Sequence, residues 1–576
     1  MIRLFVLVGV VGGSAFAARP WSGGAVAAAH PIGSAAGEEM LEAGGNAVDA
    51  AVATAFTMAV VGPYHSGLGG GGFAIVHLAK DGSDVALDFR EVAPAKASRD
   101  MYLVNGALVP SLATDGALAI AVPGAARGYL ELQAKYGKLP RARILAPAIR
   151  VAERGFVVTP KYVDLARRRE ACLRKNPEAS RIFLRPGKDG VPSPPPLGTR
   201  LAQPELARTL RLLAASGAPA FYSGPVARAV VDSVQGLGGI LTRADLERYQ
   251  TRWRKPLEGH YRGHRFVTMP LPSAGGLAIV ETLGVLEALK VDGPASHEVH
   301  ALHTFIEALR RVHAQRARLL GDPAFTAVPV EELTSREAIT RMAGEIDPEW
   351  ATPSAMLLPS EMKAPRDADA GLEPKHTTHI SVVDAWGNAV ALTTTINYYF
   401  GSCVVAKGTG VLLNDEMDDF AAQPNVPNAF NLVTGEANSI QGGKIPLSSM
   451  SPTLVFMKDR PRDVMLAVGS PGGSTITTTV LQVISYVIDG HLDVVRAVGA
   501  GRIHHQWLPD EVWVERGALD PLTASALEVR GHSLKQHESW GDAEAVMVDP
   551  LTGLRTAASD PRNEGAPAGH DAPNGK

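Results

Sequence analysis

The spacing of hydrophobic positions changes part-way along the chain, and the change separates a helix-rich part from a strand-rich part. In the first part, apolar residues recur about every three to four positions, which is the spacing of an amphipathic helix. Two short runs there, 73–78 and 85–89, instead have the pattern of strands joined by a turn at Asp81-Gly82. In the last third, strand patterns and glycine turns predominate. The segments with helical spacing are 34–61, 124–176, 200–235, 275–290 and 297–320.

The strand-rich part begins with a predicted hairpin. Residues 377–384 and 389–397 each alternate between two faces, one apolar and one rich in hydroxyl groups. The loop between them suits a three-residue turn with Gly387 in the left-handed position. In that register Thr377 lies opposite Thr395, and a register slipped by two residues is the alternative. On pattern alone an ordinary strand accounts for the threonines, because Thr is a good strand former.

The chain just before this hairpin has no regular spacing. Residues 346–376 contain five prolines, several acidic residues and no sustained periodicity. Proline fixes φ and removes a backbone donor, so a stretch of this kind does not continue a helix or a central strand. We therefore expect an exposed linker over 346–376 that ends where the hairpin begins.

The first residues have the pattern of a secretory signal peptide. Arg3 supplies a positive charge, residues 4–15 are apolar, and Ala15-Phe16-Ala17 is a small-x-small cleavage site. The apolar run is well short of the roughly 20 residues that a membrane-spanning helix needs. We expect a leader over 1–17, export, and no membrane span in the mature chain; an uncleaved anchor is the alternative.

Composition narrows the class of protein. The 576 residues are 45% hydrophobic and 20% charged, which allows a sizeable core, and at about 150 residues per domain they suggest three or four domains. The formal charge of −3, from 56 Lys+Arg against 59 Asp+Glu, leaves no basic excess for nucleic acid. The two cysteines, Cys172 and Cys403, give no disulfide framework and no cysteine zinc cluster. An exported chain with so few cysteines suits the bacterial periplasm, where disulfides are allowed but not required.

Two motifs that could hold a nucleotide or a metal do not fit their surroundings. Gly67–Gly72 matches G-x-G-x-x-G, but a helix pattern precedes it and a strand follows, the reverse of the order that dinucleotide binding requires. His297, His300 and His303 spread over one side of a helix, so we expect a solvated face there and no zinc site. The sequence therefore predicts neither a metal nor a cofactor.

The threonine that opens the hairpin has a chemical use that its strand pattern does not reveal. A threonine hydroxyl is a weak nucleophile without a neighbouring base. At a free N-terminus the residue carries its own base, an α-amine with a pKa of about 7.7–8.0 that suits proton transfer near neutral pH. Cleavage between His376 and Thr377 would create such a terminus, and the proline-rich stretch upstream is consistent with a cut there.

The sequence around Thr377 and several other motifs resemble one known family. The segment Lys375–Asp384 resembles the start of the small subunit of γ-glutamyltransferases (γ-glutamyl transpeptidases), N-terminal-nucleophile hydrolases that cleave themselves to expose this threonine. The resemblance covers nearly the whole mature chain, and six further motifs occur in the right order. They are Asp88–Glu91, Leu413–Phe420, Pro446–Pro452, Gly469–Ser474, Arg502–Trp507 and Asp560–Arg562.

The resemblance implies an architecture that replaces the three or four domains suggested by length. It implies an α/β (α+β) fold, a four-layer αββα sandwich built from both processed chains. The implied pieces are a large subunit of 18–376, whose last part is the linker, and a small subunit of 377–576.

The resemblance also implies roles for individual residues. Thr377 would be the nucleophile, with its amine held by Thr395, and the backbone N–H groups of Gly472 and Gly473 would form the oxyanion hole. The zwitterionic end of the substrate would be held through charge-assisted hydrogen bonds. Its α-carboxylate would bind Arg90, Ser448 and Ser449, and its α-ammonium would bind Asn397, Glu416 and Asp419.

The implied activity is that of a γ-glutamyltransferase and glutathione hydrolase. The threonine attacks a γ-glutamyl amide such as glutathione, and water or an amino acid or peptide acceptor resolves the resulting ester. One alternative is a cephalosporin (glutaryl) acylase of the same fold, whose acyl group lacks the ammonium; Arg90 together with Asp419 favours the γ-glutamyl substrate. Another is an inactive binding relative that is never processed. Phe430 stands where some bacterial members have a lid tyrosine, and without the hydroxyl it can contact a lid only by packing.

Overall fold

The computed structural model describes residues 19–358, 377–426, 428 and 432–572. Four sequence predictions therefore fall wholly or partly outside the described residues. They are the leader over 1–17, the linker from 359 onward, His376 at the cleavage site, and Phe430.

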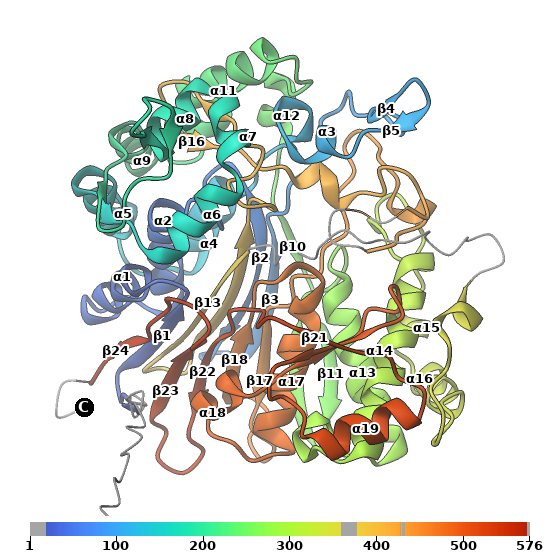
Figure 1. Cartoon of the computed structure of the whole chain (residues 1–576). Helices are drawn as coiled ribbons and strands as arrows, with labels where there is room; N and C mark the ends of the chain where they lie inside the picture. The colour runs from blue at the N-terminus through green and yellow to red at the C-terminus, as the bar shows by residue number, and fades with distance from the viewer. Residues whose placement is uncertain (1–18, 359–376, 427, 429–431, 573–576) are drawn as a thin grey trace, which may run out of the picture.

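Two β-sheets face each other in the middle of the molecule (Figure 1). The larger contains, in spatial order, β10 (Arg252–Arg254), β3 (Ser83–Asp88), β2 (Gly71–Leu78), β14 (Ala389–Thr395), β13 (Thr378–Asp384), β1 (Gly24–Ala28) and β24 (Ala568–His570). The smaller contains β11 (Leu257–Tyr261), β12 (His264–Thr268), β17 (Thr453–Phe456), β18 (Val464–Gly469), β22 (Glu544–Val548) and β23 (Arg555–Ser559).

Helices cover the outer face of each sheet. The first helical layer consists of α1 (Pro31–Glu42), α2 (Ala47–Val61), α4 (Ala125–Tyr136) and α5 (Arg141–Arg154), and the second of α13 (Ala274–Leu289), α14 (Val299–Leu319) and α17 (Ile476–Ile488). Further helices surround these: α6 (Pro160–Arg168), α7 (Glu170–Lys175), α8 (Pro177–Phe183), α9 (Pro204–Ser216), α11 (Pro225–Gly236), α12 (Arg243–Arg248), α16 (Arg336–Gly344), α18 (Val494–Gly499) and α19 (Pro521–Val529).

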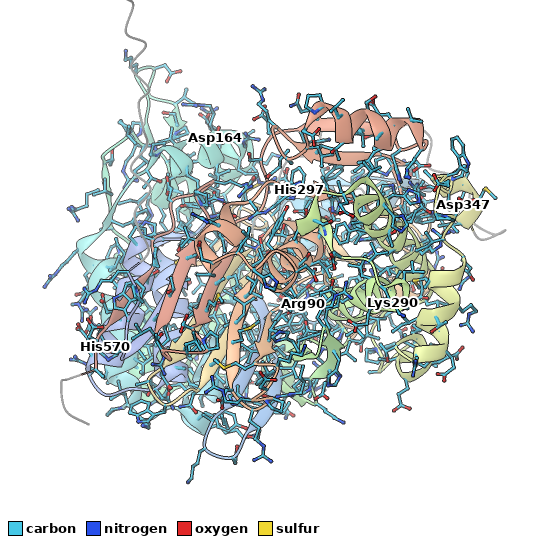
Figure 2. The ribbon with its side chains drawn as sticks, turned by 90° about the horizontal axis from the view of Figure 1, so that it is seen from below. Arg90, Asp164, Lys290, His297, Asp347 and His570 are labelled. Carbon is cyan, nitrogen blue, oxygen red and sulfur yellow. A yellow bond between two sulfur atoms is a disulfide. The ribbon has the colours of Figure 1, made fainter. Side chains whose placement is uncertain are left out.

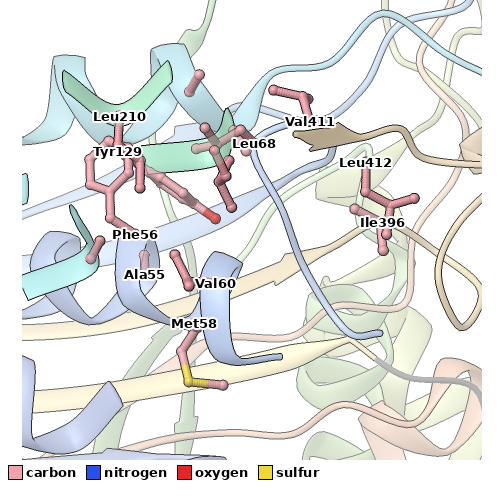
Figure 3. Packing of buried hydrophobic residues seen from close by; sticks show 14 of the residues in the cluster. Ala55, Phe56, Met58, Val60, Leu68, Tyr129, Leu210, Ile396, Val411 and Leu412 are labelled. Carbon is pink, nitrogen blue, oxygen red and sulfur yellow. The ribbon is translucent and has the colours of Figure 1, made fainter. Parts of the chain in front are cut away.

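The hydrophobic core explains why the larger sheet is buried on both faces. Successive strand residues point to opposite faces. On β2, Ala74 and Val76 pack with the first helical layer, whereas Phe73 and Ile75 pack against the second sheet. Figure 3 shows part of the helix-side core, where Phe56 packs edge-on against Tyr129 with ring centroids 5.2 Å apart. The result is a four-layer αββα sandwich, which confirms the predicted fold.

Strands from before and after residue 377 interleave in both sheets. In the larger sheet β14 pairs with β2 and β13 pairs with β1, so the hairpin is inserted between strands from the first part of the chain. In the smaller sheet β17 pairs with β12 in the same way. Neither part can bury its own strands without the other, so the chain forms one unit and the estimate of three or four domains is wrong.

The predicted elements agree with the structure in type, but the longer segments with helical spacing are each divided into several helices, and 124–176 also contains the short strand β6 (Phe156–Val157). The segment 34–61, which was expected to be helical, is two helices, because α1 ends at Glu42 and α2 begins at Ala47. Gly44 has a left-handed φ of 83°, which ends the first helix, and the Asn46 side chain accepts the Val48 and Asp49 N–H groups to cap the second. Apolar residues continue across this break because α1 buries one side and α2 is buried along its whole length on every side.

The described part of the predicted linker, 346–358, is mostly exposed but is anchored at several points, of which Ser354 is the most deeply buried. Ser354 is buried. Its hydroxyl accepts a hydrogen bond from Arg310 at 2.6 Å, and its carbonyl accepts one from the Trp507 indole at 2.9 Å. This end of the first part of the chain is therefore fastened to the last part. Over the described residues, no helix is both long enough and apolar enough to cross a membrane.

The two cysteines form a disulfide, Cys172–Cys403, with Cα atoms 5.9 Å apart. The expectation that they would give no disulfide framework is wrong to that extent. They are 231 residues apart in the sequence, so no local spacing could have indicated that the fold brings them together.

Candidate active site

The hairpin has the predicted register. Thr378 pairs with Thr394 and His379 with Thr393, which excludes the two-residue slip. The turn closes as expected, with Gly387 in the left-handed region at a φ of 87°. Both strands are buried on both faces, so the open end of the hairpin lies inside the molecule and not at an exposed edge.

Thr377 stands at this open end, and its hydroxyl is linked to the neighbouring strand. The side chain is almost fully buried, and Oγ1 donates a hydrogen bond to Thr395 Oγ1 at 3.2 Å. Thr395 Oγ1 in turn accepts the N–H of Asn397 at 2.8 Å. The structure thus places Thr377, Thr395 and Asn397 in one hydrogen-bonded group, as the pairing of Thr377 with Thr395 predicted.

The glycine-rich segment before β2 packs its backbone against this group. A Cβ atom on Gly70 would lie 1.9 Å from the Thr395 carbonyl oxygen, and one on Gly69 would lie 2.1 Å from that of Leu412. Only glycine allows the two backbones to approach so closely. The motif therefore brings β2 against the end of β14, in the helix–glycine–strand order that argues against nucleotide binding.

A second glycine pair lies between β18 and α17. Gly472 and Gly473 have positive φ values of 135° and 59° and lead through a short 3₁₀ helix, Gly473–Thr475, into α17. The first turn of a helix leaves backbone N–H groups without helical partners and carries partial positive charge. The loop can therefore present N–H donors to an oxyanion, which is the role predicted for both glycines.

One pocket brings most of the predicted site residues together. Two predicted residues are not in its lining: Gly472 directly precedes the lining residue Gly473, and His376 lies outside the described residues. Nine of the predicted residues line the pocket: Arg90, Thr377, Thr395, Asn397, Glu416, Asp419, Ser448, Ser449 and Gly473. They come from segments separated by more than 380 positions, from Arg90 to Gly473, so their meeting is a property of the fold.

Arg90 is buried in the interior of the molecule (Figure 2) and is paired with carboxylates. Its Nη1 binds Glu416, its Nη2 binds Asp419, and Glu91 lies 3.7 Å from Nη1. Burial disfavours the charged guanidinium, but these carboxylates more than compensate and raise the pKa of Arg90. The family resemblance assigned Arg90 to the α-carboxylate of the substrate and Glu416 and Asp419 to its α-ammonium. In the structure Arg90 and these two acids bind one another.

The acidic groups around Arg90 are themselves perturbed. Burial raises the pKa of Glu91 to about 7, with Arg90 opposing the shift. Burial also raises the pKa of Glu416 well above its ordinary value, and the neighbouring carboxylates of Glu91 and Asp419 act in the same direction. Three carboxyl groups are thus gathered around the Arg90 guanidinium, and their like charges disfavour ionisation of Glu91 and Glu416.

The serine pair is held by the second helical layer. The Ser448 backbone exchanges hydrogen bonds with Pro272 and Ala274, at 2.9 and 2.8 Å, at the start of α13. Its hydroxyl accepts the Met450 N–H at 3.1 Å. These contacts hold Ser448 and Ser449 in the wall of the pocket.

The sequence interpretation missed one charged residue of the pocket, Arg316 of α14. Its side chain lines the pocket and is 5% exposed. One signal was present, because Arg316 continues the helical spacing of the buried Leu302, Phe305 and Leu309, and a charge on an apolar face is unusual. Leu432, Leu447 and Ile476 add an apolar part of the lining that no motif indicated.

The histidines within and just before α14 agree with the prediction only in part. His297 and His300 are exposed, but His303 is fully buried and bonds His532 at 2.8 Å and the Asp347 carbonyl at 2.7 Å. The solvated face is therefore wrong for His303, because α19 and the segment around Asp347 cover that side of the helix. Within the described ranges, no three His, Cys, Asp or Glu side chains are grouped to hold a metal ion.

Comparison with known proteins assigns the family. A family model described as Gamma-glutamyltranspeptidase matches residues 33–570. The chain belongs to this family. It is 41% identical over 572 residues to a glutathione hydrolase proenzyme of Pseudomonas aeruginosa, covering 98% of this chain and 97% of that protein.

Members named as acylases are also similar. The chain is 36% identical over 562 residues to the Acylase ACY 1 proenzyme of Pseudomonas sp. (strain SE83), covering 95% of this chain and 94% of that protein. The crystal structure of cephalosporin acylase from Bacillus halodurans superposes with a TM-score of 0.83 at 26% identity, covering 99% and 100% of the two chains. The fold is thus shared by transpeptidases and acylases, and the residues of the pocket must distinguish them.

Proposed function

We propose that the protein is a self-processing γ-glutamyltransferase and glutathione hydrolase. The observation that carries this proposal is the pocket that joins Thr377 to the Arg90–Asp419 ion pair. A hydroxyl nucleophile next to paired opposite charges fits a substrate with a zwitterionic end and an amide a few bonds away. The higher identity to glutathione hydrolase proenzymes than to the acylase supports the same choice.

Processing is proposed at the His376–Thr377 bond. It would give a large subunit of 18–376 and a small subunit of 377–576 after removal of the leader. The interleaved strands explain how the two pieces remain one folded unit after the cut. The signal-peptide pattern supports export, and we propose the bacterial periplasm as the location.

The proposed reaction needs only groups of this chain, the donor and an acceptor. The α-amine of Thr377 takes the hydroxyl proton as Oγ1 attacks the γ-carbonyl carbon, and the N–H groups of Gly472 and Gly473 stabilise the oxyanion. The carbon–nitrogen bond breaks as the leaving amine receives the proton. Water then attacks the γ-glutamyl ester and releases glutamate, or an amino acid or peptide amine forms a new amide; both restore the free hydroxyl.

Substrate recognition is proposed to be an exchange of ion pairs. The α-carboxylate binds Arg90 with Ser448 and Ser449, and the α-ammonium binds Asp419 with Glu416 and Asn397. A zwitterion inserts between Arg90 and Asp419 and leaves each charge paired, whereas a group with only the carboxylate leaves the acids without a partner.

The test compares γ-glutamyl-p-nitroanilide with glutaryl-p-nitroanilide, which differ only in the α-ammonium. Because charge-assisted hydrogen bonds contribute about 1.5–3 kcal/mol, we expect kcat/KM to favour the γ-glutamyl substrate by about 10- to 150-fold. Faster release from the glutaryl substrate would indicate an acylase, and no release from either would indicate an inactive relative. Adding glycylglycine measures transfer against hydrolysis.

A further inference from the structure

The disulfide spans the proposed cleavage site. Cys172 lies on α7 in the first part of the chain, and Cys403 lies in the loop that follows β14. The His376–Thr377 bond is between them in the sequence. Cleavage at that bond opens the covalent loop that the disulfide closes. The two fragments remain joined, because the disulfide links one to the other.

We propose that the mature enzyme is a covalent heterodimer whose large and small subunits are joined by Cys172–Cys403. The proposal rests on the processing proposed above. After self-cleavage this disulfide remains as a covalent bond between the two chains. Its formation removes two electrons and two protons from the thiols, which a disulfide-carrying oxidant of the exporting compartment accepts.

Contacts around the disulfide fasten the same loop to the large subunit. Arg169, three residues before Cys172, donates from Nε to the Tyr399 carbonyl at 3.0 Å and from Nη2 to the Gly401 carbonyl at 2.9 Å. Its Nη1 pairs with Asp115 at 2.9 Å, which holds the guanidinium in place. The disulfide therefore closes a junction in which the two chains already make matched polar contacts.

This junction is close to the pocket along the chain. The clamped loop begins near Asn397, which lines the pocket and donates its backbone N–H to Thr395 Oγ1. Both cysteines are buried, Cys172 at 6% and Cys403 at 1% exposure, so reductant in solution has little access to them in the folded enzyme. The bond therefore also holds the loop that carries a site residue against the large subunit.

Covalent linkage changes how the processed enzyme unfolds. Two unlinked subunits separate on denaturation, so their apparent stability depends on protein concentration. Linked subunits stay together and refold as one molecule, and the long loop closed by the bond restricts the unfolded precursor. We expect the melting temperature of the mature enzyme to be independent of concentration until a denaturing reductant is added.

The decisive experiment is electrophoresis of iodoacetamide-blocked enzyme in denaturant, with and without dithiothreitol. The proposal predicts one band near the size of the mature chain without reductant and two bands with it. Two bands in both lanes would overturn the disulfide, whereas one band in both lanes would indicate failed processing, so the two failures are distinguishable. Cys403→Ser is expected to give two bands without reductant; if it does not fold, the wild-type lanes still decide.

Trypsin digestion without reduction tests both claims in one ion. The sequence predicts peptides 170–174 and 377–407, each containing one cysteine and no internal Lys or Arg. Their disulfide-linked pair starts at Thr377 in processed enzyme, and at His376 in precursor because trypsin then cuts after Lys375. Finding only the separate alkylated peptides would overturn the linkage, and finding only the His376 form would place the error in the processing.

A second, independent observation concerns Arg316. Among the described residues, its Nε and Nη1 have no hydrogen-bond acceptor although both atoms are buried, whereas both Nη atoms of Arg90 are occupied by carboxylates. Burial lowers the pKa of Arg316 to about 10, with Asp419 opposing the shift, so the group is charged at neutral pH. An unpaired buried cation facing a pocket is completed by an anionic group of the ligand.

We infer that Arg316 binds the α-carboxylate of the γ-glutamyl donor alongside Arg90. This deepens the proposed function and supplies a free cation that Arg90, already paired, does not. The probes are γ-glutamyl-p-nitroanilide and 4-aminobutyryl-p-nitroanilide, which lacks only the carboxylate. Arg316→Met is expected to lower kcat/KM about 10- to 150-fold for the first probe and to change the second far less.

Arg318→Met is the matched control, because Arg318 is exposed two positions along the same helix and does not line the pocket. An equal loss on both probes for Arg316→Met would overturn the carboxylate contact and assign the residue to packing. Arg316→Lys, which keeps the charge, is expected to restore part of the difference between the probes. The proposed function is tested separately, by the activity of the wild-type enzyme on γ-glutamyl-p-nitroanilide.

Discussion

Thr377→Ala is expected to abolish both maturation and turnover. The variant keeps the hairpin but lacks the hydroxyl that would attack the His376 carbonyl and later the donor. We expect one uncut band of about mature size on a reducing denaturing gel, and γ-glutamyl-p-nitroanilide turnover reduced by at least about 10⁴-fold. Normal two-band maturation of this variant would contradict the assignment of the nucleophile.

Two further variants separate loss of the nucleophile from loss of the fold. Thr377→Ser keeps a hydroxyl and is expected to mature, because only a methyl group is removed. Thr378→Ser changes the neighbouring residue, whose side chain points to the opposite face of β13, and is expected to mature and turn over substrate. The circular dichroism spectrum of folded Thr377→Ala should match that of the wild type if the hydroxyl is needed only for chemistry.

Much of the fold followed from local sequence patterns. The register of the hairpin was predictable because the loop after Asp384 accepts one tight turn with Gly387 at a positive φ, and that turn fixes every pair behind it. The break between α1 and α2 was not predictable, because buried residues keep a helical spacing on both sides of Gly44. Likewise, nothing in the spacing of Cys172 and Cys403 indicated that they meet.

The candidate site was predictable in membership but not in its internal contacts. The family resemblance identified the residues, and the pocket contains nine of them. It did not indicate that Arg90 is already paired with Glu416 and Asp419, because such pairing depends on side-chain geometry across distant segments. Arg316 was missed for a related reason: a single arginine within a helical pattern is usually a solvated residue.

Asp419→Ala is expected to remove the preference for an α-ammonium group. In the structure Asp419 pairs with Arg90, and in the proposed complex it binds the ammonium, so the variant loses a contact with only one kind of substrate. We expect kcat/KM for γ-glutamyl-p-nitroanilide to fall about 10- to 150-fold, while that for glutaryl-p-nitroanilide stays the same or rises. The ratio of the two constants, measured under identical conditions, is the readout.

The control for this substitution is Glu436→Gln, which also removes one negative charge but at an exposed residue that pairs with Arg99 outside the pocket. It is expected to leave the substrate ratio unchanged. An equal fall on both substrates for Asp419→Ala would mean that Asp419 supports the site only by holding Arg90. A collapse of the ratio alone would mean that the ion pair is exchanged for the substrate zwitterion, and that this exchange distinguishes the transpeptidase from an acylase of the same fold.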